Sequence, residues 1–256
     1  MKIALCLSGQ PRVVEVGFQK LNETILQHND VDVFIHTWFD PENLSTQSVI
    51  PGREGHHLSP NALNVLQELY KPKMMMVEKP KTWGRTFEYP QKTFEKAHTW
   101  ALEVPTGLDD AKGYLNNTTH CMCYSLMRSN ILKERYSSDV GVQYDWVIRN
   151  RIDYGPHLHL TFEEEPEEDT VYYQHNPDHP DGMLGDWFAR GSNSSMNVYS
   201  SVFSSLYPLV KQSNEDVGYW CNELILKYHL MNNHIKPEPI DLQVHHLLRR
   251  YLLKHL

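Results

Sequence analysis

The sequence predicts an α/β protein with a mainly parallel central sheet flanked by helices and a smaller helical C-terminal part. Short apolar runs alternate with amphipathic stretches over the first 165 residues, and glycine or proline marks the ends of several runs. Strands separated by helices need crossover connections, which favour parallel pairing in a sheet covered on both faces. Polar clusters also follow several of the apolar runs directly.

Four apolar runs in this first part are predicted strands: 2–7, 31–35, 73–77 and 145–148. A helix is predicted over 13–28. Another begins at Ser59 and Pro60, because a hydroxyl cap followed by proline is typical of a helix start. Its apolar stripe ends at Tyr70.

A long helix is predicted to begin at a cap formed by Thr118 or Thr119 and to continue through Arg135. Its predicted core face carries three apolar side chains at helical spacing: Tyr124, Met127 and Ile131.

The acidic run 163–169 predicts a solvated loop, because like charges around a proline disfavour regular structure. It divides a single predicted domain, residues 1–256, into a first part (1–165) and a second part (166–256). The second part is predicted to hold a strand at 170–173 and helices at 194–206 and 215–232.

The composition excludes several classes of protein. The chain has 256 residues, a net charge of −8, 40% hydrophobic and 22% charged residues, which is typical of a globular protein. The negative charge argues against nucleic-acid binding. No apolar run has the length of a membrane span or a secretory signal. The four cysteines do not form a disulfide or zinc pattern, so we expect buried thiols and a cytoplasmic protein.

Three polar clusters follow predicted strands, at 8–12, 36–38 and 149–153. Ligands of open α/β sheets bind beyond the carboxyl ends of the strands, so these clusters are predicted to meet at one ligand-binding edge.

The first cluster offers groups that suit phosphate oxygens: the Ser8 hydroxyl, the Gly9 backbone and the Arg12 guanidinium, with Gln10 between them. It matches neither the dinucleotide nor the nucleoside-triphosphate loop. A plain strand-to-helix turn explains the cluster equally well.

In the third cluster, Asp153 is expected to hold a divalent cation, Mn²⁺ or Mg²⁺, on a diphosphate, while Arg149 or Arg151 neutralises the remaining charge. A surface network of arginine and aspartate is the alternative. In the second cluster, His36 is a candidate for orienting a base or ribose, and Trp38 for stacking on it. Both are also plausible core residues.

Five segments, taken in order, resemble a family of bacterial and viral glycosyltransferases of the GT-A type. They are Leu-Ser-Gly-Gln-Pro-Arg at 7–12, Asp-Val-Phe-Ile-His-Thr-Trp at 32–38, Asp-Trp-Val-Ile-Arg-Asn-Arg-Ile-Asp at 145–153, Gly-Asp-Trp-Phe-Ala-Arg-Gly-Ser at 185–192 and Met-Asn-Val-Tyr-Ser at 196–200. The resemblance implies a GT-A-like fold whose first part binds a nucleotide sugar and whose second part lies on the acceptor side. It also implies that residues 8–12 lie against the nucleotide and that Asp153 binds metal and donor diphosphate. Asp186 would lie near the donor sugar or acceptor, and Glu223 matches an acidic helix residue of the family.

Glycosyl transfer needs a carboxylate that can deprotonate the acceptor hydroxyl, and Asp186 and Glu223 are the candidates. Otherwise Asp186 caps a turn and Glu223 faces solvent. The expected acceptor, by analogy alone, is a glycan, a lipid-linked sugar or a polysaccharide precursor. The alternative function is a non-catalytic nucleotide- or glycan-binding module on the same fold. A sulfotransferase is disfavoured because no lysine-bearing phosphate loop follows the first strand.

Overall fold

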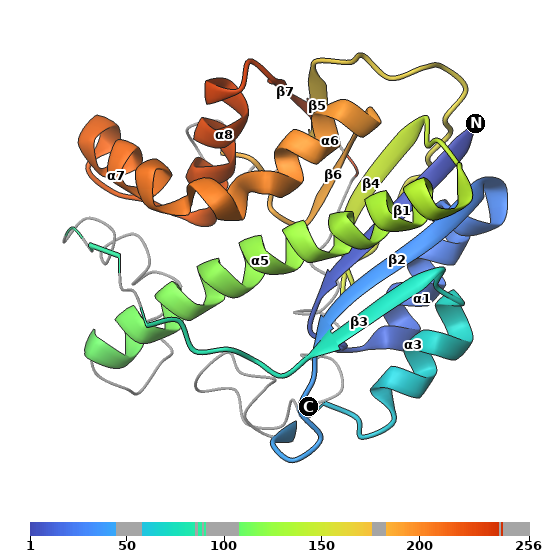
Figure 1. The fold of residues 1–256 in the computed structure, drawn as a ribbon, viewed down its shortest axis with the longest axis horizontal. Coiled ribbons are helices and arrows are strands. Elements are labelled where there is room, and N and C mark those ends of the chain that lie inside the picture. The colour runs from blue at the N-terminus through green and yellow to red at the C-terminus, as the bar shows by residue number, and fades with distance from the viewer. Residues whose placement is uncertain are drawn as a thin grey trace.

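A seven-stranded sheet runs through the protein in the order β3-β2-β1-β4-β6-β5-β7 (Figure 1). The computed structural model describes residues 1–44, 58–84, 87–88, 90, 108–175, 183–240 and 242. The strands are β1 (Lys2–Gly9), β2 (Asp30–Trp38), β3 (Met74–Glu78), β4 (Trp146–Arg151), β5 (Thr170–Gln174), β6 (Phe188–Gly191) and β7 (Lys236–Ile240).

Parallel pairing dominates this sheet, as predicted. β1 lies parallel to both β2 and β4, β3 is parallel to β2, and β7 is parallel to β5. Only β6 runs antiparallel to its neighbours β4 and β5. The α/β fold class is therefore confirmed. Strands from both parts of the chain share the sheet, while residues 243–256 of the predicted second part lie outside the described residues.

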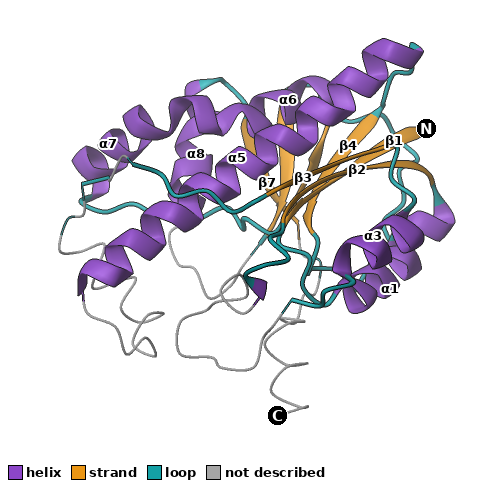
Figure 2. Cartoon of the chain, turned by 60° about the horizontal axis from the view of Figure 1, so that its bottom comes forward, coloured by secondary structure: helices purple, strands orange, loops and turns teal. Residues whose placement is uncertain are grey.

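Helices cover both faces of the sheet (Figure 2). One face carries α1 (Val14–Thr24) and α3 (Ala62–Tyr70); the other carries α5 (Leu108–Val140), α6 (Asn193–Ser200), α7 (Leu206–Val217) and α8 (Asn222–Asn232). Two short 3₁₀ helices, η1 (Leu26–His28) and η2 (Ser201–Ser205), continue α1 and α6.

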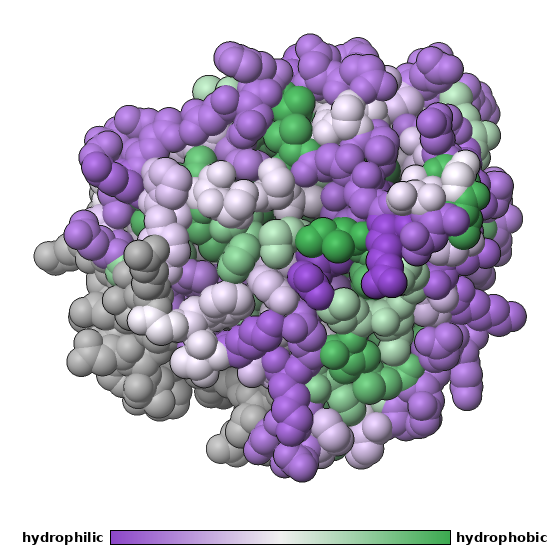
Figure 3. Space-filling view, viewed as in Figure 1, coloured by the Kyte–Doolittle hydropathy of each residue, from purple (hydrophilic) through white to green (hydrophobic). Residues whose placement is uncertain are grey.

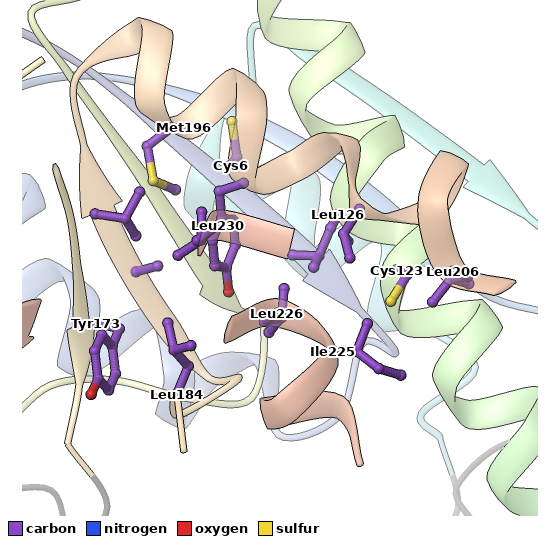
Figure 4. Close-up of a cluster of buried hydrophobic side chains, with 14 of the residues drawn as sticks. Cys6, Cys123, Leu126, Tyr173, Leu184, Met196, Leu206, Ile225, Leu226 and Leu230 are labelled. Atoms are coloured by element: carbon purple, nitrogen blue, oxygen red, sulfur yellow. The ribbon is translucent and has the colours of Figure 1, made fainter. Parts of the chain in front are cut away.

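Alternate residues of the inner strands enter two separate apolar layers, because side chains of a strand alternate between the faces of a sheet. Toward α5, α6 and α8, the layer includes Ala4, Cys6, Phe34, Val147, Cys123, Leu126, Met196 and Leu226 (Figure 4). Toward α1 and α3, it includes Ile3, Leu5, Leu7, Leu21, Ile35, Leu66 and Ile148. The outer surface on the α5 side is largely hydrophilic, with apolar patches near its centre (Figure 3).

The long helix differs from its prediction at its start. It begins at Leu108, and Thr119 is a buried side chain inside α5 that donates a hydrogen bond to Asn222 Oδ1 at 2.7 Å. The predicted threonine cap is therefore wrong.

The core face of α5 is also displaced from the predicted one. Ile131 is 42% exposed, whereas Lys133 is fully buried, with its ammonium bonded to Asn193 and Asn197 of the α6 segment. The prediction assumed an apolar inner face, but part of this face is polar and finds its partners on α6.

Other helices begin or end at residues that differ from the predicted ones, and the reasons are local. The helix predicted over 215–232 is divided, since Gly218 adopts φ 76° and ends α7 before α8 begins. The helix predicted to begin at Ser59 and Pro60 begins at Ala62, with Asn61 at the N-cap position and no side-chain cap bond; Ser59 Oγ accepts the Asn61 N–H at 3.2 Å in the turn before it. The strands β6 and β7 were not predicted. The acidic run 163–169 lies outside helices and strands, as predicted.

The cysteines are free thiols, as predicted, although only two of them are buried. Cys6 and Cys123 lie in the core, and Cys121 and Cys221 are half-buried.

Candidate functional site

The predicted polar clusters meet at the carboxyl edge of the parallel strands. Ser8 at the end of β1 lies opposite His36 of β2 and Arg151 of β4. Ser8, His36 and Arg149 occupy the same alternate positions as Cys6, Phe34 and Val147, which pack toward α5, α6 and α8. The site therefore lies at the end of the sheet, on the α5 side of it (Figure 1).

The turn after β1 has two unusual backbone positions. Gly9 has φ 119°, and a Cβ at this position would have no heavy atom within 4 Å. Val13, just before α1, has φ 42°, a left-handed conformation that is strained for a β-branched residue. Such strain marks a backbone whose shape is set by its surroundings, and the open space beside Gly9 leaves the backbone approachable.

A chain of buried hydrogen bonds fixes this turn. The Gly9 N–H donates to Ser125 Oγ of α5 at 3.2 Å, Ser125 Oγ lies 2.7 Å from His36 Nδ1, and His36 Nε2 lies 2.9 Å from Glu78 Oε2. A carboxylate accepts only, so the neutral ring donates from Nε2 and accepts the Ser125 hydroxyl at Nδ1. Burial lowers the pKa of His36 to about 4 despite the opposing Glu78 carboxylate, so the ring is neutral near pH 7.

Glu78 anchors the far end of that chain. Burial would raise the pKa of this carboxyl, but hydrogen bonds from Lys81, His36 and Tyr124 outweigh burial and lower the pKa to about 2. Lys81 Nζ lies 2.6 Å from Glu78 Oε1 and 4.4 Å from the centre of the Tyr124 ring. The described contacts of Glu78 therefore make it an ionised structural anchor.

His36 and Trp38 serve the site from inside the protein. The His36 ring is fully buried with both nitrogens engaged. Trp38 is 4% exposed, and its indole N–H donates to the Cys121 carbonyl at 3.3 Å. The structure thus places both residues behind the turn, where His36 supports Gly9 through Ser125.

Asp153 is the centre of a guanidinium–carboxylate cluster. Arg151 donates from Nε to Asp153 Oδ1 and from Nη2 to Asp153 Oδ2, each at 2.8 Å, and Arg12 Nη2 lies 2.9 Å from Asp153 Oδ2. Burial would raise the pKa of Asp153, but the charges of Arg151 and Arg12 lower it below its ordinary value. The Arg–Asp network considered from the sequence is present, and it lies at the predicted edge.

Arg149 is buried two residues before Arg151 on β4. It is 2% exposed, and among the described residues its Nε and Nη1 have no hydrogen-bond partner. Burial lowers its pKa, while the charges of Tyr199 and Asp186 act in the opposite direction. Buried donors without partners are rare in folded proteins, so this guanidinium indicates a place where a ligand or solvent completes the bonding.

Asp186 reaches the site because its segment packs against β4 and β5. The Arg151 N–H donates to the Trp187 carbonyl at 3.2 Å. A Cβ at Gly185 would lie 2.4 Å from the Gln174 carbonyl oxygen, so only glycine allows this close approach before Asp186. Asp186 is half-buried and within electrostatic range of Arg149, Tyr199 and Glu223.

Glu223 enters the same cluster from the first turn of α8. Burial, together with the Asp186 charge, raises the pKa of its carboxyl to about 7, while the Cys221 thiol donates a hydrogen bond to it. Tyr199 of α6 is fully buried, and its hydroxyl has no hydrogen-bond partner among the described residues. The structure therefore brings the two predicted acidic residues together from distant segments, and Asp186 is also within electrostatic range of Arg149.

Several residues of the site were not predicted. Glu78 follows a predicted strand, so the rule that selected the other clusters would have found it. Ser125 and Tyr199 lie within helices, where no spacing distinguishes them from core residues.

The expected cation does not fit the donor set at Asp153. Mg²⁺ and Mn²⁺ require several oxygen ligands, whereas both Asp153 oxygens already accept guanidinium N–H groups. The described part of the chain contains no group of three or more His, Cys, Asp or Glu side chains arranged to hold a metal.

Comparisons with known proteins add a structural similarity. No protein-family model matches the chain, and no curated protein sequence does. The apo form of the glycosyltransferase GlyE of Streptococcus pneumoniae TIGR4 is similar over 92% of this chain, with 12% identity and a TM-score of 0.39. The match covers 44% of that chain's length. A similarity at this level does not identify a function. Among the described helices, none combines the length and the apolar character that a bilayer crossing requires.

Proposed function

We propose that this protein is a glycosyltransferase that moves a sugar from a nucleoside-diphosphate donor to an acceptor hydroxyl. One observation carries the proposal: at the carboxyl edge of the sheet, the candidate base Asp186 is within electrostatic range of both the buried Arg149 and the second candidate base, Glu223. A base and a cationic group in one place are what sugar transfer from an anionic leaving group needs.

In the proposed reaction, the acceptor oxygen attacks the anomeric carbon of the donor sugar as the bond from that carbon to the diphosphate oxygen breaks. The acceptor proton passes to the Glu223 carboxylate, whose raised pKa suits a base near neutral pH. The electron pair leaves with the diphosphate, and the guanidinium groups of Arg12, Arg149 and Arg151 stabilise its charge. Asp186 is the alternative base. The 8–12 turn would hold the nucleotide.

The finer expectations rest on family resemblance. We place the reaction in the cytoplasm, which agrees with four free thiols. The acceptor would be a glycan, a lipid-linked sugar or a precursor of a polysaccharide.

The test is release of nucleoside diphosphate from a panel of UDP-, GDP-, CDP- and dTDP-sugars, with Mn²⁺ present and candidate acceptors added. We expect one donor to be consumed, and Glu223→Gln and Asp186→Asn to reduce its turnover by at least about tenfold. Glu215→Gln is the matched control, because Glu215 is an exposed carboxylate on α7 paired with Lys211. Wild-type turnover in all three variants would contradict the assignment of Glu223 or Asp186 as the base.

A second candidate is a non-catalytic nucleotide- or glycan-binding module, favoured by the neutralisation of Asp153 by two arginines. Binding of a donor without its consumption under any condition of the panel would support this candidate over the transferase.

A further inference from the structure

The Asp153 carboxylate binds and orients two arginine side chains. Its carboxylate accepts three N–H contacts between 2.8 and 2.9 Å from Arg12 and Arg151, and its side chain is 3% exposed. A cation approaching Asp153 would have to displace two charged groups that are already bonded to it. Fork-like bonding to a carboxylate also fixes the plane of the Arg151 guanidinium.

Three guanidinium groups gather at this place. Those of Arg12 and Arg151 share the carboxylate of Asp153, and the guanidinium of Arg149 is within electrostatic range of Asp153 and Asp186. Arg149 forms no ion pair within the described part of the chain, so no bonded carboxylate neutralises its charge. The protein as a whole carries −8, so a cluster of three arginines is a specific feature rather than a general one.

Three buried donors at the same place have no acceptor among the described residues: Arg12 Nε and the Nε and Nη1 of Arg149. Arg12 and Arg151 are nevertheless reachable, because their side chains are 24% and 29% exposed. The open space beside Gly9 lies at the end of the same strand edge. A ligand with several anionic oxygens supplies both the missing charge and the missing acceptors.

We propose that this edge is a cation-independent binding site for a diphosphate. In this site Arg12 and Arg151 contact the anion, the buried Arg149 contributes positive charge, and Asp153 positions the guanidinium groups instead of binding a metal. The inference deepens the proposed function and rests on it for the identity of the anion as a nucleoside diphosphate. It replaces the divalent cation expected at Asp153 with arginine charge.

The test is a thermal-shift panel with inorganic pyrophosphate, UDP, GDP, CDP and dTDP, each measured in EDTA and again with Mn²⁺. We expect at least one diphosphate near 100 times its Kd to raise Tm by about 5–10 °C, by the same amount in both conditions. Arg12→Gln and Arg149→Met should lose most of this shift. Arg135→Gln is the control, because Arg135 is 69% exposed on α5 and paired only with Asp139 among the described residues.

Asp153→Asn separates a positioning residue from a metal ligand. As a positioning residue, it should reduce the ligand-induced shift equally in EDTA and in Mn²⁺, because the guanidinium groups lose their anchor in both. A reduction seen only with Mn²⁺ would identify Asp153 as a cation ligand and overturn the inference.

Other outcomes are equally decisive. A shift that requires Mn²⁺ and disappears in EDTA would overturn the arginine site while leaving the glycosyltransferase proposal intact. A cation-independent shift that both arginine variants retain would also overturn it. A shift in EDTA that both variants lose, without consumption of any donor sugar, would support this site and reject the transferase. No shift with any diphosphate would reject both.

Discussion

Replacing Arg149 by methionine should make the unliganded protein more stable. The Arg149 side chain is 2% exposed, and two of its three nitrogens have no hydrogen-bond partner. Removing a buried, incompletely bonded charge in favour of an apolar side chain of similar length is often stabilising. Methionine would continue the apolar layer that contains Cys6, its neighbour across β1 and β4.

The magnitude follows from the two unbonded nitrogens. Each buried unsatisfied group costs about 1–3 kcal/mol, so the lower limit for both is about 2 kcal/mol. At this chain length, 1 kcal/mol corresponds to about 2–4 °C in Tm, which gives an increase of about 4–8 °C. Attraction between Arg149 and Asp186 offsets part of this gain, so we expect the lower end of the range.

Differential scanning calorimetry of the unliganded proteins measures this effect, and Arg190→Met is the matched control. Arg190 of the neighbouring strand β6 is half-buried, and its Nε also has no hydrogen-bond partner among the described residues. Its guanidinium, however, lies 5.0 Å from the Trp146 ring and 5.1 Å from the Phe162 ring. We expect the loss of these cation–π contacts to outweigh the removal of one unbonded donor, so Tm should fall. A fall of several degrees in Arg149→Met as well would show that Arg149 is a structural residue and refute the reasoning.

Three further predictions concern other residues of the site. Gly9→Ala should lower the unfolding free energy by about 1–2 kcal/mol, because φ is 119°, and it should also weaken diphosphate binding, whereas Gly141→Ala (φ 70°) should affect stability alone in the same melts. The pKa of His36 is about 4 in the folded protein, below its unfolded value of about 6.5, so its contribution to stability is complete above pH 6.5 and is lost as the pH falls toward 4. Urea titrations at several pH values should show that His36→Gln removes up to about 3 kcal/mol of the pH dependence of the unfolding free energy. The raised pKa of Glu223 predicts that kcat/KM of donor consumption rises with pH through about 7 and that Glu223→Gln removes this limb; a flat wild-type profile would exclude Glu223 as the base.

The arrangement of the parallel strands was predictable because each of these strands is marked by a local apolar run in the sequence. The residues of β1, β2 and β4 are mostly buried, since a parallel strand covered on both faces has little room for polar alternation, whereas β3 lies at the edge of the sheet and is mostly half-buried. Once these strands are parallel, their carboxyl ends share one edge. The meeting of Ser8, His36 and Arg151 follows from topology alone.

What escaped prediction depends on partners distant in sequence. The buried Lys133 pairs with the adjacent Glu134 at 2.7 Å, but its other partners, Asn193 and Asn197, come from the distant α6 segment. β7 contains two prolines, which argue against a strand unless it lies at the edge of the sheet, as β7 does. The occupation of Asp153 by Arg12 is of the same kind, because the two residues are 141 positions apart and nothing in either segment selects the other.

The site combines features that folding alone would not favour. Val13 holds a left-handed backbone, two nitrogens of Arg149 have no partner among the described residues, and His36 is buried so deeply that its pKa falls to about 4. The first two features reduce stability and the third does so below about pH 6.5, while the two apolar layers on either side of the sheet compensate for the loss. Unfavourable local choices that cluster at one edge of an otherwise consistent fold indicate selection for a ligand. If Arg149→Met raises Tm while abolishing diphosphate binding, the same guanidinium will have been shown to oppose folding and to support binding.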